Sequence, residues 1–164
     1  MAELKDKPPI TSAIRLLKQQ KAVYNEHFYD YVEHGGTAQI ARELSIDEHL
    51  VVKTLIFETD AKKPLVILMH GDCSVSQKNL ARQLGVKSVR PCDPEVAEHY
   101  SGYHCGGTSP FGTRRRMPIY IERSILDLPR LYINAGHRGY VLEMAPAELV
   151  RILQPTPVDV ANQD

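Results

Sequence analysis

Short runs of apolar residues recur along the chain and predict a series of strands. The clearest run spans residues 51–57, and the next spans residues 65–70. A short turn region at residues 62–64 separates them, so the two strands are predicted to pair as antiparallel neighbours. Further strand-like runs occupy residues 23–31, 86–90, 117–121, 130–134 and 140–144.

Helices are predicted where a capping residue or a proline precedes a helix-compatible segment. The predicted helices run from Thr11 to Gln20, Thr37 to Leu44, Ser76 to Leu84, Asp93 to His99 and Pro146 to Leu153. Strands and helices interleave without a regular βαβ rhythm, and several strand pairs have short connections. The predicted fold class is therefore α+β, with a mixed, largely antiparallel sheet and peripheral helices.

With 164 residues the chain is predicted to form one domain, over residues 11–155. Residues 1–10 are predicted to be a flexible tail and residues 156–164 a weakly ordered end. Composition is that of a soluble globular protein, with 43% apolar and 24% charged residues. No apolar run is long enough to cross a bilayer, so no membrane partner is expected. The three cysteines lack CxxC spacing, which favours a reducing compartment and predicts a cytoplasmic protein.

The formal net charge is zero, with 20 basic and 20 acidic residues. Proteins that bind nucleic acid through their overall charge are usually basic, and this chain is neutral. Any RNA contact must therefore come from a local patch. The run Arg114, Arg115 and Arg116 is the best candidate, although such runs are often only solvated surface.

The segment 102–112 combines four glycines, Thr108, Ser109 and Pro110. Such a loop lets a ligand approach backbone N–H groups closely, and the three arginines that follow it are suited to a phosphate. An ordinary surface connection between two elements would look similar.

Two other features suggest a site. Lys53 shares a predicted strand face with Val51 and Leu55, so its ammonium either needs partners or covers a solvent-facing end of the strand. The turn 134–139 contains Asn134, His137 and Arg138, which are suited to a ligand or an anion, although it also reads as a simple hairpin turn.

Known catalytic and metal-binding patterns are otherwise missing from the sequence. The seven histidines show no metal-ligand spacing, and no metal is predicted. There is no GxSxG elbow, P-loop or Rossmann pattern. Cys105 is interpreted as a small apolar filler, since nothing nearby clearly lowers its thiol pKa.

Together these segments resemble the YbaK family of aminoacyl-tRNA deacylases, which is related to the editing domain of bacterial prolyl-tRNA synthetases. The resemblance rests on residues 52–55, 78–81, 84–87, 102–112 and 132–139, and covers roughly residues 11–155. It implies a compact mixed α/β fold that hydrolyses mischarged tRNA in trans, most closely cysteine on proline tRNA, with alanine or another small residue as the alternative. It implies no metal or organic cofactor, and it implies tRNA as partner, with prolyl-tRNA synthetase as a possible second one.

The resemblance also implies roles for individual residues. Lys53 would anchor the 3′-terminal adenosine or its phosphate, and Gly106 would act with it in catalysis. The remaining expected site residues fall into two groups. Substrate binding is expected at Tyr29, Thr54, Gly107, Thr108, Ser109, Pro110, Asn134 and Gly136, and RNA binding at Arg114, Arg115, Arg116, His137 and Arg138.

Two rival functions stay open on the sequence. A non-catalytic RNA-binding module of the same fold is favoured by Val141 and Asn134, which stand where the YbaK subgroup has an aspartate and a serine. A small-molecule-binding domain is compatible with the neutral net charge.

Overall fold

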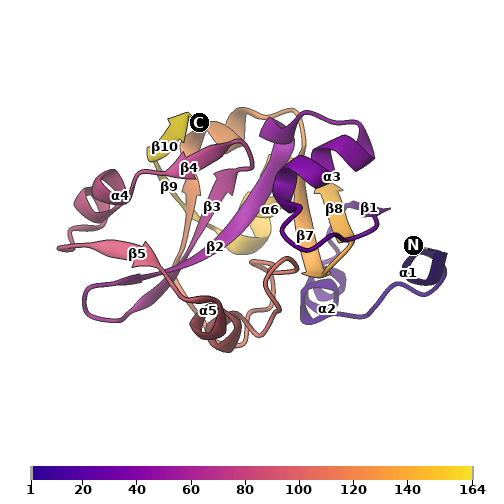
Figure 1. Ribbon diagram of the computed structural model, residues 1–164, viewed down its shortest axis with the longest axis horizontal. Helices are drawn as coiled ribbons and strands as arrows, with labels where there is room; N and C mark the ends of the chain where they lie inside the picture. The colour runs from indigo at the N-terminus through magenta and orange to yellow at the C-terminus, as the bar shows by residue number, and fades with distance from the viewer. Residues whose placement is uncertain (1, 164) are drawn as a thin grey trace.

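The computed structural model describes residues 2–163, and its centre is the strand β2 (Val51–Thr59). β2 pairs antiparallel with β3 (Pro64–His70), with Leu55 opposite Ile67. All seven residues of β3 are buried, as expected for a strand covered on both faces. The predicted antiparallel pair is therefore confirmed, and it forms the middle of the sheet (Figure 1).

The other strands extend this sheet in the order β1-β8-β7-β2-β3-β6-β9, with β5 paired to β2. Their bounds are β1 (Asn25–Phe28), β5 (Val89–Pro91), β6 (Ile119–Glu122), β7 (Leu131–His137), β8 (Tyr140–Met144) and β9 (Thr156–Val158). A separate two-stranded sheet pairs β4 (Cys73–Val75) with β10 (Ala161–Gln163). Antiparallel pairs outnumber the parallel ones, which confirms the predicted mixed, largely antiparallel sheet.

Helices cover both faces of the large sheet (Figure 1). One core contains Ile14 and Leu17 of α2 (Ser12–Gln19) and Leu149 of α6 (Pro146–Leu153). On the opposite face, α4 (Gln77–Leu84) packs over β3 and α3 (Gly36–Leu44) packs over the start of β2. The remaining helical segments are α1 (Ala2–Asp6), α5 (Pro94–Ser101) and the 3₁₀ turns Glu48–Leu50 and Arg123–Asp127.

Capping chemistry sets several helix ends as predicted. The Thr11 hydroxyl accepts a hydrogen bond from the N–H of Ile14 at 3.1 Å, and Ser76 does the same for Asn79 at 3.3 Å. Gly85 ends α4 with φ +71°, the left-handed conformation that favours glycine.

Thr37 corrects one prediction, because it does not cap α3. The N-cap is Gly35, and the Thr37 hydroxyl bonds instead to Glu48 at 2.7 Å and to the Gly71 carbonyl at 3.1 Å. The Thr37 hydroxyl therefore makes tertiary contacts in place of the helix cap that the local sequence pattern predicts.

Both chain ends contain elements where the sequence predicted little order. Residues 2–6 form α1 within the predicted tail. At the other end, β9 pairs with β6, and β10 pairs with β4. Strands of three residues carry too little periodicity to be recognised in a sequence.

Over the part of the chain that the structure describes, no helix is both long and apolar enough to span a membrane.

Candidate functional site

The glycine loop (residues 102–112) and the basic turn (residues 134–139) lie directly against each other. The Asn134 side-chain amide donates to the carbonyl of Gly106 at 3.1 Å, and its oxygen accepts from the N–H groups of Gly136 and His137. A Cβ on Gly107 would lie 2.9 Å from the backbone nitrogen of Arg138. Only glycine therefore allows this close approach of the two backbones.

Arg138 crosses from the basic turn to the glycine loop. Its Nε donates to the carbonyl of Cys105 at 2.8 Å, and its guanidinium carbon lies 4.9 Å from the centre of the Tyr31 ring. The Tyr31 hydroxyl in turn lies only 2.6 Å from where a Cβ on Gly106 would be. Tyr31, Gly106 and Arg138 thus form one packed group.

Glu98 of α5 holds the same loop from the other side. Its carboxylate accepts the N–H of Cys105 at 3.0 Å and lies 3.3 Å from Nδ1 of His104. These contacts hold the pKa of the Glu98 carboxyl below its usual value, with the bond from Cys105 as the largest cause. Because Arg138 binds the Cys105 carbonyl, the backbone of Cys105 is fixed on both sides.

Several predicted loop residues are interior. Ser109 is fully buried, and its hydroxyl accepts from the N–H of Phe111 at 3.2 Å; Pro110 is buried beside it. Thr108 is half-buried. Ser109 and Pro110 therefore act on a bound group only through the shape of the loop.

Lys53 and Thr54 follow the point at which β2 and β7 stop pairing. The parallel register joins Val51 to Tyr132 and Val52 to Ile133 and goes no further. By strand alternation the two side chains point to opposite faces of β2. The Thr54 hydroxyl is buried and has no hydrogen-bond partner among residues 2–163. A buried hydroxyl without a partner is costly.

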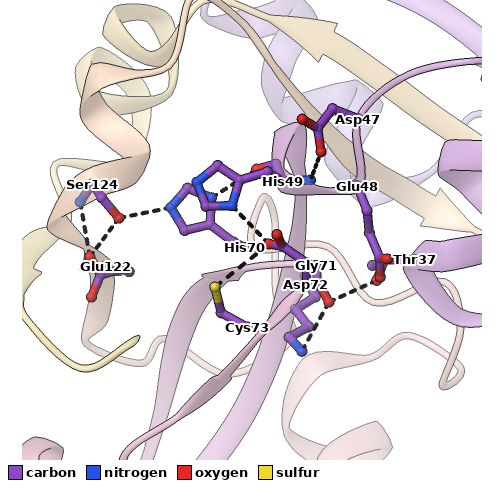
Figure 2. Close-up of polar contacts among 11 residues, drawn as sticks. Thr37, Asp47, Glu48, His49, His70, Gly71, Asp72, Cys73, Glu122 and Ser124 are labelled. Atoms are coloured by element: carbon purple, nitrogen blue, oxygen red, sulfur yellow. Dashed lines mark hydrogen bonds and ion pairs between the residues drawn. The ribbon is translucent and has the colours of Figure 1, made fainter. Parts of the chain in front are cut away.

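The ammonium of the half-buried Lys53 donates to the carbonyl of Gly71 at 3.4 Å. The same carbonyl accepts from the Thr37 hydroxyl at 3.1 Å (Figure 2). A Cβ on Gly71 would lie 2.7 Å from the Thr37 side chain, so glycine is needed there. Among residues 2–163, no hydrogen bond joins Lys53 to the glycine loop. A substrate bound by both would have to bridge them.

A histidine cluster that the sequence did not reveal adjoins Gly71 (Figure 2). The rings of His49 and His70 stack with centroids 3.7 Å apart and planes within 8°, and His49 Nδ1 lies 2.8 Å from the carboxylate of Asp72. Donor atoms of all three residues lie within 4.8 Å of one another. However, the lone pairs of stacked parallel rings lie in separate planes and do not converge on one ion. As arranged, the cluster is a hydrogen-bonded network.

Buried His70 links this cluster to β6. Its Nδ1 lies 2.8 Å from the carbonyl of His49, which can only accept, so Nδ1 carries a proton. Its Nε2 lies 2.8 Å from the hydroxyl of Ser124, which also lies 2.7 Å from the Glu122 carboxylate. Burial lowers the pKa of His70 below its usual value and favours the neutral ring. The single Ser124 hydroxyl proton then has two competing acceptors.

The remaining predicted residues lie outside the packed group. Tyr29 is only 4% exposed, in a core with Ile40 and Val141. The exposed arginines 114–116 come after the glycine loop and lie against the C-terminal end of α5, where Arg115 lies over the Tyr100 ring at 5.2 Å. Burial, and then the charge of Glu98, raise the pKa of the Cys105 thiol, which makes it a poor nucleophile and agrees with its interpretation as a filler.

Two surface hollows share no residue with the glycine loop or the basic turn. One, of about 650 Å³, is lined in part by Val23, Arg130 and Glu148, and the other, of about 430 Å³, adjoins α4.

Comparison with known proteins identifies the family. The model of a family described as the aminoacyl-tRNA editing domain matches residues 34–152, which include β2, the glycine loop and the basic turn. The chain belongs to this family. The predicted membership of the YbaK-type deacylases and the predicted class of aminoacyl-tRNA editing hydrolase are thereby confirmed.

Relatives of this editing domain include two kinds of protein. An Enterococcus faecalis protein, provisionally named Cys-tRNA(Pro)/Cys-tRNA(Cys) deacylase EbsC, is 29% identical over 94% of both chains. A proline–tRNA ligase of Limosilactobacillus fermentum is 24% identical over 62% of this chain but only 18% of the ligase.

Solved structures share the fold of the editing domain. A hypothetical protein superposes with a TM-score of 0.85 at 22% identity, covering 93% of this chain and 100% of its own. A protein provisionally described as a trans-editing enzyme for prolyl-tRNA synthetase gives 0.79 at 19% identity, with coverage of 92% and 97%.

The glycine loop and the basic turn are recognisable in the sequence, but the residues that contact them are not. Tyr31, Glu98 and Gly71 carry no motif, and their parts appear only when distant segments meet. The sequence signal nearest to Tyr31 is the substrate-binding role expected for Tyr29, two positions earlier in the chain.

Proposed function

We propose that this editing domain hydrolyses mischarged aminoacyl-tRNA in trans, with cysteine on proline tRNA as its substrate. The observation that carries the proposal is the match, 29% identical over 94% of both chains, to a protein provisionally named Cys-tRNA(Pro)/Cys-tRNA(Cys) deacylase. The ligase match, which covers a fraction of that enzyme, supports the acceptor end of proline tRNA as the bound nucleic acid. Association with prolyl-tRNA synthetase and a cytoplasmic location belong to the same proposal.

In this proposal Lys53 and the glycine loop bind opposite ends of the reacting ester. The Lys53 ammonium has one described acceptor, the carbonyl of Gly71, so it retains donors for the 3′-terminal adenosine or its phosphate. None of the hydrogen bonds described for residues 2–163 uses the N–H of Gly106, which would polarise the ester carbonyl.

The attacking group comes from the substrate. The Cys105 thiol has a raised pKa, and the Ser109 hydroxyl is buried in a hydrogen bond, so neither is an activated nucleophile. The cysteinyl sulfur would attack its own carbonyl carbon, and the bond from that carbon to the ribose oxygen would break. The ribose oxygen takes the proton that the thiol lost, and water then opens the cyclic thioester to give free cysteine. Orientation supplies most of the rate in such a reaction.

A non-catalytic RNA-binding module remains the second candidate, favoured by Val141 and Asn134. Val141 is fully buried in an apolar core, and the Asn134 amide is committed to the glycine loop. Neither residue supplies the acid or hydroxyl group of the YbaK subgroup.

The test is release of amino acid from proline tRNA charged with cysteine and, in parallel, with alanine. We expect the wild-type protein to release cysteine in multiple turnovers and to leave the alanyl ester intact, because alanine has no thiol to attack its own carbonyl carbon. Faster release of alanine would contradict cysteine as the substrate. Tight binding without release of either would contradict hydrolysis and favour the module.

A further inference from the structure

Gln39 fixes the segment that carries Tyr31. Its side-chain amide, only 3% exposed, donates to the carbonyl of Asp30 and accepts from the N–H of Val32 at 3.2 Å. The two peptide groups that flank Tyr31 are therefore tied to one buried amide. Gly35 leaves the necessary space, because a Cβ there would lie 2.3 Å from the Gln39 side-chain oxygen.

Tyr31 in turn fixes Arg138. The guanidinium lies over the Tyr31 ring, and its Nε is held by the carbonyl of Cys105. The Arg138 backbone is set against Gly107. A side chain that is normally mobile is thus held by a ring, a carbonyl and its own backbone.

Arg138 has no carboxylate partner among the residues that the structure describes. Four other arginines do: Arg90 with Glu58, Arg123 with Asp159, Arg130 with Glu143 and Arg151 with Glu148. Among residues 2–163, Nε is the only nitrogen of the Arg138 side chain with an acceptor, so the four N–H groups of its two terminal nitrogens are available as a planar fork. Such a fork matches the paired oxygens of a phosphate.

We propose that Arg138, held over the glycine loop by Tyr31, binds a phosphodiester of the RNA acceptor strand, and that Gln39 positions Tyr31 for this purpose. The inference rests on the proposed function for the identity of the RNA. It adds Tyr31 and Gln39 as positioning residues. The ring acts by keeping the guanidinium oriented before RNA arrives, which lowers the entropic cost of binding.

The experiment measures the affinity of uncharged proline tRNA against sodium chloride concentration, so it does not depend on hydrolysis. For Arg138→Met we expect weaker binding and a logarithmic salt slope reduced by about 0.7, the value for one phosphate contact on a single strand. Arg123→Met is the control, because that arginine already has Asp159 as its partner, and we expect it to behave as wild type.

Tyr31 variants separate positioning from general damage. Tyr31→Phe retains the ring face and should bind as wild type. Tyr31→Leu should lose about 2–5-fold in affinity, the range of an exposed cation–π contact. In the Arg138→Met background, Tyr31→Leu should have no further effect, because the ring acts through the guanidinium. If Gln39→Leu folds, it should lose as much tRNA affinity as Tyr31→Leu does. If it does not fold, the comparison of Tyr31→Phe with Tyr31→Leu tests the positioning role.

Several results would overturn the inference. They are wild-type affinity and slope in Arg138→Met, equal binding by Tyr31→Phe and Tyr31→Leu, or additive losses in the double variant. A further outcome would assign the Arg138 fork to free phosphate. In it, inorganic phosphate competes with tRNA binding at constant ionic strength, while the tRNA affinity does not depend on Arg138. Deacylation by a protein whose tRNA binding ignores Arg138 would refute the inference and leave the proposed function standing.

Discussion

At Gly107 the glycine loop has no room for a side chain. The nearest atoms to a Cβ there are the backbone nitrogen of Arg138 at 2.9 Å and the carbonyl carbon of His137 at 3.0 Å. Backbone atoms cannot rotate away as a side chain would, so an added methyl group must push the loop and the turn apart. The hydrogen bonds of Asn134 and Arg138 across this contact depend on the same spacing.

We therefore expect Gly107→Ala to lower both the stability and the deacylase activity of the protein. Overpacking of this kind costs about 1–3 kcal/mol. Gly85→Ala is the control: nothing lies within 4 Å of a Cβ there, and only the positive φ is strained, at about 1–2 kcal/mol. Urea unfolding and single-turnover deacylation measure the two effects. Full activity in Gly107→Ala would show that the contact does not shape the site.

For single residues, the sequence predicted local roles better than it predicted tertiary partners. Thr11 caps α2 as its type and position predict. The pattern predicts Thr37 at a helix end, but its hydroxyl bonds to Gly71. It predicts a ligand for Asn134, and the structure adds a bond from its amide to the glycine loop. Each partner lies far away in the chain, and no local pattern encodes such a choice.

Among the elements, the C-terminal strands depend on one buried carboxylate. Glu122 of β6 accepts the N–H groups of Val160 at 2.8 Å, Ala161 at 3.0 Å and Ser124 at 3.0 Å. Burial opposes ionisation, but these bonds and the Ser124 hydroxyl outweigh it and hold the pKa of Glu122 below its usual value. The ionised side chain thereby fastens the segment between β9 and β10 to the sheet.

This arrangement gives the stability a defined pH dependence. A carboxyl group whose pKa is lowered by folding stabilises the protein above about pH 4.5, and the contribution is lost as pH falls through the folded-state pKa. We expect Glu122→Gln to cost about 1–3 kcal/mol at pH 7 and to flatten the acid side of the stability profile. Urea unfolding between pH 3 and 7 measures both. Glu33→Gln, at an exposed position, is the control, and equal profiles for the two variants would contradict the role given to Glu122.

Most long elements were predictable from pattern, and the short ones were not. The strands β2, β3 and β8 and the helices α2, α4 and α6 lie close to their predicted positions. The strand predicted over residues 23–31 forms only over Asn25–Phe28, and Gln39 binds the backbone that follows it. The strands β4, β9 and β10 have three residues each and exist because of tertiary pairing.

For the whole molecule, the sequence predicted the class of fold but not the strand order. The parallel pairing of β2 with β7 brings residues 51–52 beside residues 132–133, and this brings the start of the basic turn next to the strand that carries Lys53. The candidate site therefore combines four segments that are far apart in the chain: Tyr31, Lys53, the glycine loop and the basic turn. Since the net charge is zero, RNA must be recognised by such a local assembly.

The most direct test of the account compares the wild-type protein with Lys53→Ala in multiple-turnover deacylation of cysteine-charged proline tRNA. Lys78→Ala, an exposed lysine on α4, is the matched control, and circular dichroism checks that each variant folds. The account requires rapid cysteine release by the wild type and by Lys78→Ala, and loss of release in a folded Lys53→Ala protein. Full release by Lys53→Ala, or none by the wild type, would contradict it.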